Sequence, residues 1–325
     1  MENADNYILK VDDLKTYFAI KKGLLRRTVG HVKAVDGVTF QIRAGQTLGL
    51  VGESGCGKTT VARTIVRLVP ATSGRIVFED IDVTSADKTK LRRIRKDVSL
   101  IFQDPFGSLN PRMTVGNIVA DPLRVQKKLS GPALTNHVAT LLSKVGLSSS
   151  HINRYPHEFS GGQRQRIGVA RALALEPKLV ICDEPVSALD VSIQSQILNL
   201  LKDLQDQFRL TYLFIAHDLA VVKFFCDVVA VMYLGRIVER AADDEIYRRP
   251  LHPYTRALMS AIPHVDPSLR HQRSAPGGEV PSALEPPEGC RFHPRCPLAD
   301  DNCKKHTPPL EKKDDSEHFV ACWKS

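Results

Sequence analysis

The stretch GESGCGKT at residues 52–59 combines closely spaced glycines with a lysine and a threonine. It fits the phosphate-loop pattern G-x-x-x-x-G-K-[ST], and it stands between the apolar run TLGLVG (47–52) and a stretch of helical pattern. In such a loop the backbone N–H groups point at phosphate oxygens, and the dipole of the next helix favours negative charge. Lys58 supplies positive charge to the β- and γ-phosphates, and Thr59 offers a hydroxyl to Mg²⁺. The residues expected to bind the nucleotide phosphates are Gly52, Glu53, Ser54, Gly55, Cys56 (a small filler), Gly57, Lys58, Thr59 and Thr60.

An acidic pair ends a second apolar run, KLVICDEP, at residues 178–185. The run has the composition of a buried parallel strand, and α/β proteins bind ligands at the carboxyl ends of such strands. Asp183 needs a cation or hydrogen bonds to be tolerated there, and a Mg²⁺ ion held by Thr59 would satisfy it. Glu184 follows, where it could orient and deprotonate an attacking water. A surface acid pair is the alternative, which the phosphate loop makes the weaker interpretation.

The residues around these motifs alternate between apolar strands and helices, which predicts an α/β core with a mainly parallel sheet. Strands are expected at 7–18, 35–51, 98–103, 178–185 and 210–218, with a hairpin at 227–240 around Leu234–Gly235. Helices are expected at 58–69, ended by Pro70, and at 191–208, with one apolar face formed by Ile193, Ile197, Leu200, Leu204 and Phe208. The pattern from about 106 to 175 is helical and polar, which indicates an inserted helical subdomain.

Three further motifs stand in order around the acidic strand: FSGGQRQR at 159–166, SALD at 187–190 and AHD at 216–218. Together with the phosphate loop, they strongly resemble the ATP-binding cassette family across residues 7–240. The resemblance implies a P-loop NTPase of the α/β class, with a parallel-sheet core, an antiparallel β subdomain and the inserted helical subdomain. We expect this cassette domain at residues 1–245 and a small irregular domain at 246–325, which contains a proline-rich linker around 264–289.

The same resemblance implies a role for each motif residue. Gln103 would link the Mg²⁺ and water site to the helical subdomain, and would join Thr59 and Asp183 as a Mg²⁺ ligand. His217 would contact the γ-phosphate and help hold the water, so the expected catalytic residues are Glu184, His217 and Gln103. The backbone N–H groups of four signature residues would cap the γ-phosphate bound by a second nucleotide-binding domain: Ser160, Gly161, Gly162 and Gln163. Asp190 would lie at the contact between the two domains.

The adenine ring is expected to stack on an aromatic side chain near the first strand, as the resemblance implies. Phe18 fits this role best and Tyr17 is the alternative. An insertion at 19–31 follows them, and ordinary strand packing remains a second interpretation of both side chains.

The composition of the chain indicates which class of protein it belongs to. The 325 residues are 42% hydrophobic and 25% charged, as in ordinary soluble proteins, and carry a net charge of +9. The first 18 residues lack the regions of a signal peptide, and no apolar run approaches the ~18 residues of a membrane-spanning helix. We therefore expect a soluble, cytosolic protein with reduced cysteines. The basic clusters KKGLLRR and KTKLRRIRK lack interleaved aromatic residues, which favours solvated faces over nucleic-acid binding.

Longer stretches closely resemble the ATPases of oligopeptide and dipeptide permeases: FQDPFGSLNPRMTVG (102–116), RYPHEFSGGQRQRI (154–167) and LHPYTRALMSAIP (251–263). This resemblance implies an ATP-hydrolysing subunit on the cytoplasmic face of the cell membrane, which drives import through conformational coupling. Its expected partners are a second homologous ATPase, two transmembrane permease subunits and, indirectly, an extracellular or periplasmic solute-binding protein, with no nucleic acid. Residues 104–120 would receive a short helix of the membrane subunit. Nickel, oligosaccharides or opines are alternative cargoes, and a soluble cassette ATPase acting on DNA or ribosomes is the alternative class.

Four of the seven cysteines lie near the end of the chain: Cys290, Cys296, Cys303 and Cys322. Four thiolates in a reduced compartment suit Zn²⁺ or an iron–sulfur cluster. Structural zinc usually shows Cys-x₂₋₄-Cys pairs, which this spacing lacks. The segment GEVPSALEPPEGCRFHPRCP (278–297) continues the permease resemblance, which implies a 4Fe–4S cluster. Zn²⁺ is one alternative, and four free or disulfide-linked cysteines are another. His293 and His306 are interpreted as surface residues.

Overall fold

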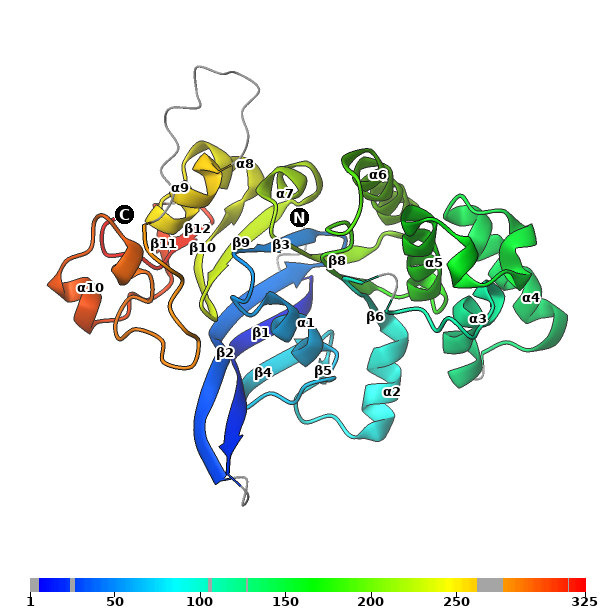
Figure 1. The fold of residues 1–325 in the computed structure, drawn as a ribbon, viewed down its shortest axis with the longest axis horizontal. Helices are drawn as coiled ribbons and strands as arrows, with labels where there is room; N and C mark the ends of the chain where they lie inside the picture. Colours follow the sequence, from blue (N-terminus) through cyan, green and yellow to red (C-terminus); the bar gives the residue numbers. More distant parts are fainter. Residues whose placement is uncertain (1–5, 24–26, 105–106, 127, 262–276, 315) are drawn as a thin grey trace. The chain divides into compact units, whose positions relative to one another are not determined.

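The computed structural model describes residues 6–23, 27–104, 107–126, 128–261, 277–314 and 316–325, and these divide into two compact units (Figure 1). The helical unit comprises Met1–Ile8, Arg43–Gln46 and Ala86–Ile215. The phosphate-loop unit comprises Leu9–Ile42, Thr47–Ser85 and Ala216–Ser325. Both units draw on separated stretches of the chain, and the domain boundary expected at residue 245 stays a prediction.

Three parallel strands form the core of the helical unit, in the order β6 (Val98–Ile101), β7 (Leu179–Asp183) and β8 (Thr211–Ala216). Every residue of β7 and β8 is buried, as their continuous apolar composition predicts for strands covered on both faces. The register pairs Ile101 with Cys182 and Cys182 with Phe214. The carboxyl ends of the three strands therefore lie at one edge of the sheet.

Helix α6 (Val191–Phe208) has the bounds that the sequence predicts, but its buried face is rotated from the expected one. Of the five predicted residues, Ile197 and Leu204 are buried, whereas Ile193, Leu200 and Phe208 are half-buried. The buried face consists of Ile197, Leu198, Leu201, Leu204 and Gln205. Gln205 belongs to it because its amide donates to the backbone carbonyl of Gly45 at 3.0 Å, which offsets the cost of burying a polar group.

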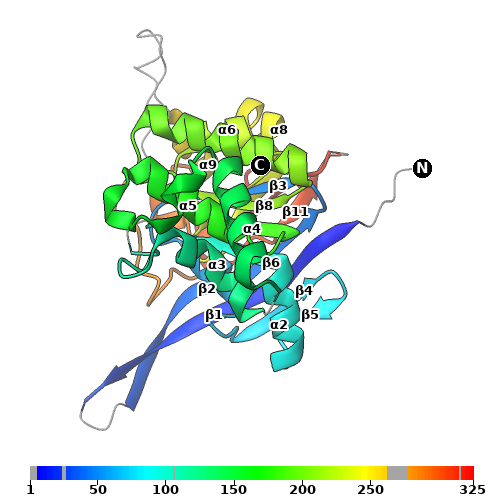
Figure 2. The ribbon, with the colours of Figure 1, turned by 90° about the vertical axis from the view of Figure 1, so that its right-hand side faces the viewer.

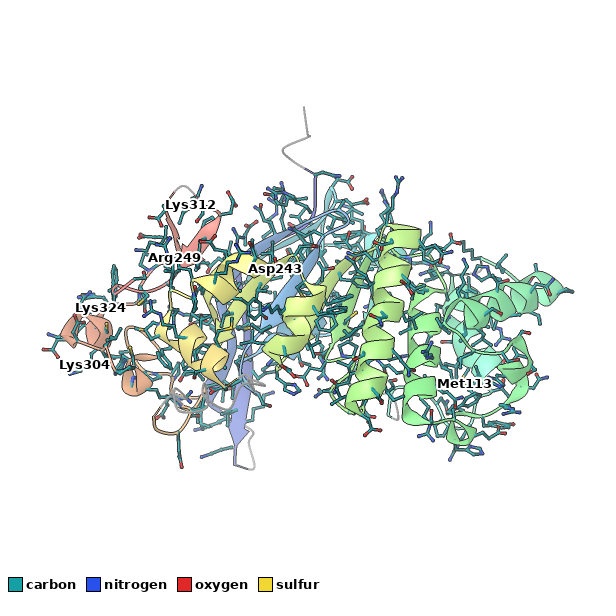
Figure 3. All side chains as sticks on the ribbon, turned by 90° about the horizontal axis from the view of Figure 1, so that it is seen from above. Met113, Asp243, Arg249, Lys304, Lys312 and Lys324 are labelled. Atoms are coloured by element: carbon teal, nitrogen blue, oxygen red, sulfur yellow. The ribbon has the colours of Figure 1, made fainter. Side chains whose placement is uncertain are left out.

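The inserted helical subdomain is confirmed. It contains α3 (Val115–Val125), α4 (Gly131–Lys144), two 3₁₀ turns (Ser149–Asn153 and Pro156–Glu158) and α5 (Gly161–Leu173), and Figures 1 and 2 show the three helices side by side. Thr114 caps α3 by accepting a hydrogen bond from the backbone of Asn117. Met113, in the polar loop before α3, is half-buried (Figure 3). Residue 106, where the subdomain was expected to begin, lies outside the described residues.

An antiparallel sheet forms one layer of the phosphate-loop unit, in the order β2 (Arg27–Arg43), β1 (Tyr7–Lys22), β4 (Ser73–Phe78) and β5 (Ile81–Asp82). It confirms the expected antiparallel subdomain, although β1 and β2 are longer than predicted and run on as a two-stranded ribbon (Figure 1). The predicted strand 35–51 is split by a turn at residues 44–46, where Gly45 has a positive φ of 78°. Its second half becomes a separate strand, β3 (Thr47–Val51).

The second sheet of this unit begins with β3, which runs parallel to β9 (Val228–Tyr233). A hairpin leads from β9 to β10 (Arg236–Ala242), as predicted. Its turn residues Leu234 and Gly235 have φ of 41° and 81°, the positive values that a tight type I′ turn requires. The helices of the unit are α1 (Lys58–Ile65), α7 (Leu219–Phe225), α8 (Asp243–Arg248), α9 (Pro253–Ser260) and α10 (Asp301–Lys305). Helix α1 ends before the expected Val69 because Arg67 adopts a left-handed conformation.

The C-terminal segment adds two strands that the sequence did not predict. β12 (His318–Val320) pairs with β10, and β11 (Glu311–Lys313) pairs with β12. The described part of the predicted linker, residues 277–289, has neither helix nor strand, and residues 264–276 lie outside the described ranges. Among the helices of the described residues, none is both long and apolar enough to cross a membrane.

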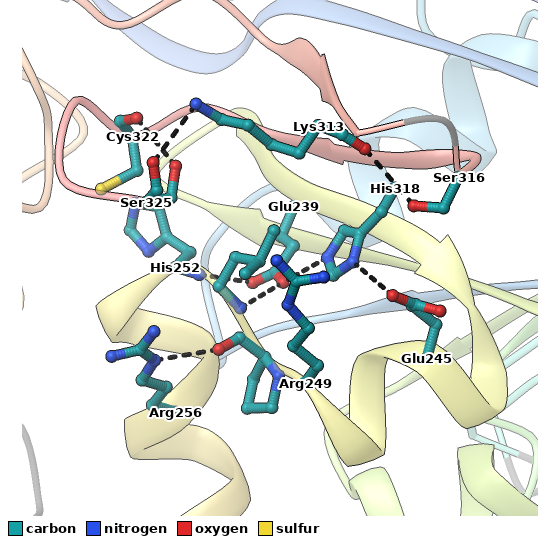
Figure 4. A network of polar contacts seen from close by, with 12 residues as sticks. Glu239, Glu245, Arg249, His252, Arg256, Lys313, Ser316, His318, Cys322 and Ser325 are labelled. Carbon is teal, nitrogen blue, oxygen red and sulfur yellow. Dashed lines mark hydrogen bonds and ion pairs between the residues drawn. The ribbon is translucent and has the colours of Figure 1, made fainter.

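A buried carboxylate holds this sheet edge to the start of α9 (Figure 4). Glu239 is fully buried, and it accepts hydrogen bonds from the backbone N–H groups of Leu251 at 2.7 Å and His252 at 2.9 Å. His318 Nε2 lies 2.7 Å from the same carboxylate. His252 Nδ1 accepts the N–H of Tyr254 at 3.0 Å, and burial lowers the pKa of His252 to about 4. The folded chain therefore keeps this imidazole neutral.

We expect His252 to make the folded chain acid-sensitive. An unfolded histidine has a pKa of about 6.5, so between pH 6.5 and 4 the unfolded chain takes up a proton that the folded chain does not. Stability from this group is complete above pH 6.5 and falls by about 2–3 kcal/mol as the pH drops towards 4. His252→Asn keeps an acceptor that can cap α9 and removes the titrating group. Urea denaturation at pH 7 and pH 4.5 should therefore show that this variant loses less unfolding free energy on acidification than the unmodified chain does. His306→Asn, at an exposed histidine, is the matched control. An equal acid loss in His252→Asn and the unmodified chain would contradict the assignment.

Candidate active site

The phosphate loop connects the fully buried strand β3 to the start of α1 at Lys58. Two of its glycines have no room for a side chain. A Cβ on Gly52 would lie 2.1 Å from the carbonyl oxygen of Met232, and a Cβ on Gly57 would lie 2.1 Å from that of Ala34. Gly57 also has a φ of 110°, which favours glycine. The backbone around the loop is therefore close-packed on both sides.

Lys58 is only 4% exposed, so its ammonium group needs partners. Its Nζ donates to the carbonyl oxygens of Gly52 at 2.7 Å and Glu53 at 3.0 Å, and lies 3.7 Å from the sulfur of Cys56. Burial raises the pKa of the Cys56 thiol in spite of the charge of Lys58. A neutral, buried thiol agrees with its interpretation as a small filler. The Lys58 charge is thus held on the loop itself.

Two residues that the sequence did not single out fix Glu53. The N–H of Glu53 donates to the hydroxyl of Tyr254 at 2.9 Å. The guanidinium of Arg295 donates to both carboxylate oxygens of Glu53, at 2.8 and 3.1 Å, and its side chain is 6% exposed. The hydrogen bond with Glu53 is the largest of the effects that raise the pKa of Arg295. Both lie within stretches that resemble the permease ATPases, but nothing in those stretches points to Glu53, because it is distant in the sequence.

The acidic pair ends β7 in the helical unit. Asp183 is 2% exposed, and Glu184 Oε2 accepts a hydrogen bond from Gln103 Nε2 at 2.9 Å. The contact follows from the register, since β6 and β7 are neighbouring parallel strands that end at the same edge. Glu184 has a positive φ of 48°, and its N–H donates to the carbonyl of Ile215 at 3.0 Å. Gln103 and Glu184 are thus brought together, and their roles at a Mg²⁺ and water site stay predictions.

The signature residues form the start of α5. Ser160 and Gln163 make a capping box, in which each side chain accepts the other's backbone N–H, at 3.4 and 3.0 Å. A Cβ on Gly162 would lie 2.6 Å from Ile193 of α6, so close helix packing needs glycine there. Asp190 is exposed at the start of α6, and its side chain makes no capping hydrogen bond. A polar surface of this kind is compatible with the expected contact to a second cassette.

The other residues that the sequence predicts as Mg²⁺ and phosphate ligands belong to the phosphate-loop unit. Thr59 lies at the start of α1, and His217 is an exposed residue between β8 and α7. The Mg²⁺ ligand set and the catalytic set that combine residues of both units stay predictions.

The two candidate aromatic residues have different surroundings. The Tyr17 hydroxyl donates to Asp36, and burial, with this contact, raises the pKa of Tyr17 to about 12. Arg291 and Arg236 also pair with Asp36. Burial alone would raise the pKa of Asp36, but the Tyr17 hydrogen bond and the two arginine charges outweigh it and hold that pKa below its usual range. Phe18 is 41% exposed, and the adenine contact stays a prediction.

The four C-terminal cysteines line one small cavity, together with Phe292 and Trp323 among others: Cys290, Cys296, Cys303 and Cys322. None of them forms a disulfide, and burial raises the pKa of the Cys290 thiol to about 11. Among the described residues, no group of three or more histidine, cysteine or acidic side chains is arranged to hold a metal ion. The donor chemistry fits a metal group, but the side chains are not in ligand geometry. His306 is exposed, whereas His293 is half-buried and its Nδ1 lies 2.9 Å from the carbonyl of Cys290.

Comparisons with protein families identify two regions of the chain. Residues 35–187 match the model of the ABC transporter family. Residues 238–303 match the C-terminal region of oligopeptide/dipeptide transporters.

Similar proteins cover nearly the whole chain. The chain is 52% identical to the oligopeptide transport ATP-binding protein AppF of Bacillus subtilis, over 97% of this chain and 96% of that one. It is 53% identical to OppF of Salmonella typhimurium and to OppF of Escherichia coli, over 98% of this chain and 96% of each relative.

Solved structures show the same cassette fold. The dimeric ATP-binding cassette MJ0796, in a post-hydrolysis state bound to ADP and phosphate, has a TM-score of 0.64 and 27% identity, over 72% of this chain and 98% of its own. CbiO1 of Clostridium perfringens has a TM-score of 0.64 and 28% identity, over 75% of this chain and 92% of its own. With half of its residues shared with known transport ATPases over nearly their full length, the chain belongs to the ABC transporter family and is one of its ATP-hydrolysing subunits.

Proposed function

We propose that the chain powers the import of di- or oligopeptides by hydrolysing ATP beneath a membrane permease. The observation that carries the ATPase part is Glu184, which follows a buried strand and is bonded to Gln103 at 2.9 Å. The peptide part rests on the relatives, whose names describe oligopeptide transport, and on the matching C-terminal region. This subunit supplies energy, and the cargo passes through other subunits.

In the proposed reaction, Glu184 accepts a proton from the water that attacks the γ-phosphate. Gln103 holds the carboxylate in place, and His217 contacts the γ-phosphate. Lys58 exchanges its carbonyl partners for phosphate oxygens, which keeps its buried charge compensated throughout. Thr59, Gln103 and Asp183 would hold Mg²⁺, which neutralises charge on the β- and γ-phosphates.

The start of α5 serves a nucleotide bound by a second, homologous ATPase. The backbone N–H groups of its first turn and its helix dipole favour the negative charge of a γ-phosphate. A dimeric cassette that holds ADP and phosphate is among the similar solved structures, which supports this arrangement. Two transmembrane permease subunits and a solute-binding protein complete the proposed importer, in which the chain is peripheral on the cytoplasmic face.

Glu184→Gln should bind ATP normally and hydrolyse it about 10²–10⁴-fold more slowly in the assembled transporter, since the amide keeps the shape and loses the base. Lys58→Ala should instead weaken ATP binding about 10- to 100-fold, because phosphate charge is left uncompensated. Phosphate release and equilibrium nucleotide binding separate the two effects. Glu176→Gln, at an exposed glutamate of the same unit, is the control. Near-normal turnover in Glu184→Gln would remove the residue from the role of base.

We expect residues 104–120 to contact the permease. Arg112 is exposed in the loop before α3, so Arg112→Ala should preserve basal ATP hydrolysis and reduce its coupling to transport. Arg112→Cys should crosslink to the membrane subunit, whereas Lys88→Cys, at the exposed start of α2 (Lys88–Asp97), should not. Transport that is fully coupled in Arg112→Ala, with no crosslink from Arg112→Cys, would contradict the docking site.

We also propose that the four C-terminal cysteines hold a 4Fe–4S cluster, which would act as a structural crosslink. The supporting observation is that all four line one cavity although up to eighteen residues separate neighbours in the sequence. The half-buried thiols of Cys290 and Cys296 have raised pKa values and must release their protons to solvent when they bind a cation, so loading should release protons.

Protein purified without oxygen should be brown and contain iron and acid-labile sulfide. Cys296→Ser should lose the colour and expose the C-terminal segment to protease, whereas Cys226→Ala, at a buried cysteine outside the group, should keep both. Colourless protein with one equivalent of zinc would replace the cluster by zinc and retain the four ligands. Protein with neither metal would overturn the proposal.

A further inference from the structure

The C-terminal segment reaches the phosphate loop through one residue, Glu53. Arg295 donates two hydrogen bonds to the Glu53 carboxylate, at 2.8 and 3.1 Å, in a bidentate arrangement. Tyr254 accepts the Glu53 N–H at 2.9 Å, and Lys58 Nζ donates to the Glu53 carbonyl at 3.0 Å. The side chain, the N–H and the carbonyl of one loop residue are therefore each held by a different partner.

The groups that hold Glu53 are part of a packed aromatic cluster. Tyr254 is fully buried, and its ring packs against Tyr233 and Phe292, with centroid distances of 4.6 and 5.5 Å. Phe292 is 2% exposed and stands at a right angle to Tyr233, with 5.3 Å between the ring centroids. Arg295 Nη1 also donates to the Tyr233 hydroxyl at 3.4 Å. An aromatic cluster thus fixes both the guanidinium and the hydroxyl.

The Arg295–Glu53 ion pair is shielded from solvent and has a defined geometry. The Arg295 side chain is 6% exposed and that of Glu53 is 27% exposed, so the pair is shielded from solvent far better than a surface ion pair. A planar guanidinium fixes both the position and the orientation of a carboxylate, which a lysine ammonium cannot do. The arginine therefore determines where the second residue of the phosphate loop can lie.

A phosphate loop binds only when its N–H groups converge on the phosphates, so a loop that is held in advance pays less conformational entropy on binding. We infer that Arg295 and Tyr254 are positioning residues for ATP, which act through Glu53 to hold the phosphate loop in its binding conformation. The inference rests on the proposed nucleotide site. It assigns to the C-terminal segment an effect on nucleotide affinity as well as its contribution to the sheet.

The test measures Mg–ATP binding to the full chain at a temperature where every variant is folded, together with the melting temperature of each. Arg295→Lys keeps the charge and loses the two-pronged geometry, and Glu53→Gln keeps the shape and loses the charge. Each should weaken Mg–ATP binding about 10-fold. Tyr254→Phe removes only the hydroxyl that accepts the Glu53 N–H, and it should weaken binding less than either of them. The double variant Arg295→Lys/Glu53→Gln should be no weaker than either single variant, because both remove the same contact.

The controls separate positioning from stability. Lys304→Ala removes an exposed ion pair with Asp301 in the same segment and should leave binding unchanged (Figure 3). In the assembled transporter, Arg295→Lys should raise the KM for ATP while kcat holds. A contact that only attaches the segment would lower the melting temperature and leave the affinity of the folded chain as it was.

The outcomes distinguish this inference from the proposed function. If Lys58→Ala binds Mg–ATP as tightly as the unmodified chain, the proposed nucleotide site itself is wrong. If Lys58→Ala binds weakly but Glu53→Gln and Arg295→Lys bind normally, the site stands and the inference is overturned. Additive losses in the double variant would also overturn it, since the two side chains would then act independently. If Arg295→Lys fails to fold, the Mg–ATP affinity of Glu53→Gln tests the same contact from the phosphate-loop side.

Discussion

Close approach of backbone to backbone is the constraint on which the phosphate-loop unit depends. The loop passes between two carbonyl groups that leave no room for a Cβ on Gly52 or Gly57. The carbonyl of Cys56 accepts the N–H of Gly235 at 2.8 Å, and Gly235 in turn accepts the N–H of Asp36 at 2.8 Å. The loop, the β9–β10 turn and the middle of β2 are therefore packed together. A loop fixed in this way can bury the charge of Lys58 and still offer its N–H groups to a ligand.

The helical unit positions the Glu184 carboxylate with a strained backbone conformation. Glu184 adopts a positive φ, which costs a non-glycine residue on the order of 1–3 kcal/mol. The bond from its N–H to Ile215, and those from Ser187 to its carbonyl, hold it there. The chain leaves β7 at that residue in a sharp turn, which presents the carboxylate to Gln103. Strained backbone of this kind concentrates at functional sites, and here it coincides with the proposed base.

Sequence reasoning succeeded where local pattern dictates structure. The strands that carry the acidic pair, the hairpin at Leu234 and the bounds of α6 follow from apolar runs, turn chemistry and helical periodicity. It failed where the deciding partner is remote. The buried face of α6 includes Gln205, whose backbone acceptor is remote in the sequence, and β12 forms by pairing with the edge of β10. Arg295 was invisible as a site residue because nothing near it in the chain identifies Glu53 as its partner.

The distance along the chain between Glu53 and Arg295 has a consequence for synthesis. The two residues are 242 positions apart. At roughly 5–20 residues per second, the ribosome adds the arginine about 10–50 s after the glutamate. Every motif of the cassette is complete long before then, yet the loop still lacks the side chain that steadies it. A nascent chain that has not yet added Arg295 would therefore bind ATP more weakly than the finished subunit, as the variants that lack this contact are expected to do.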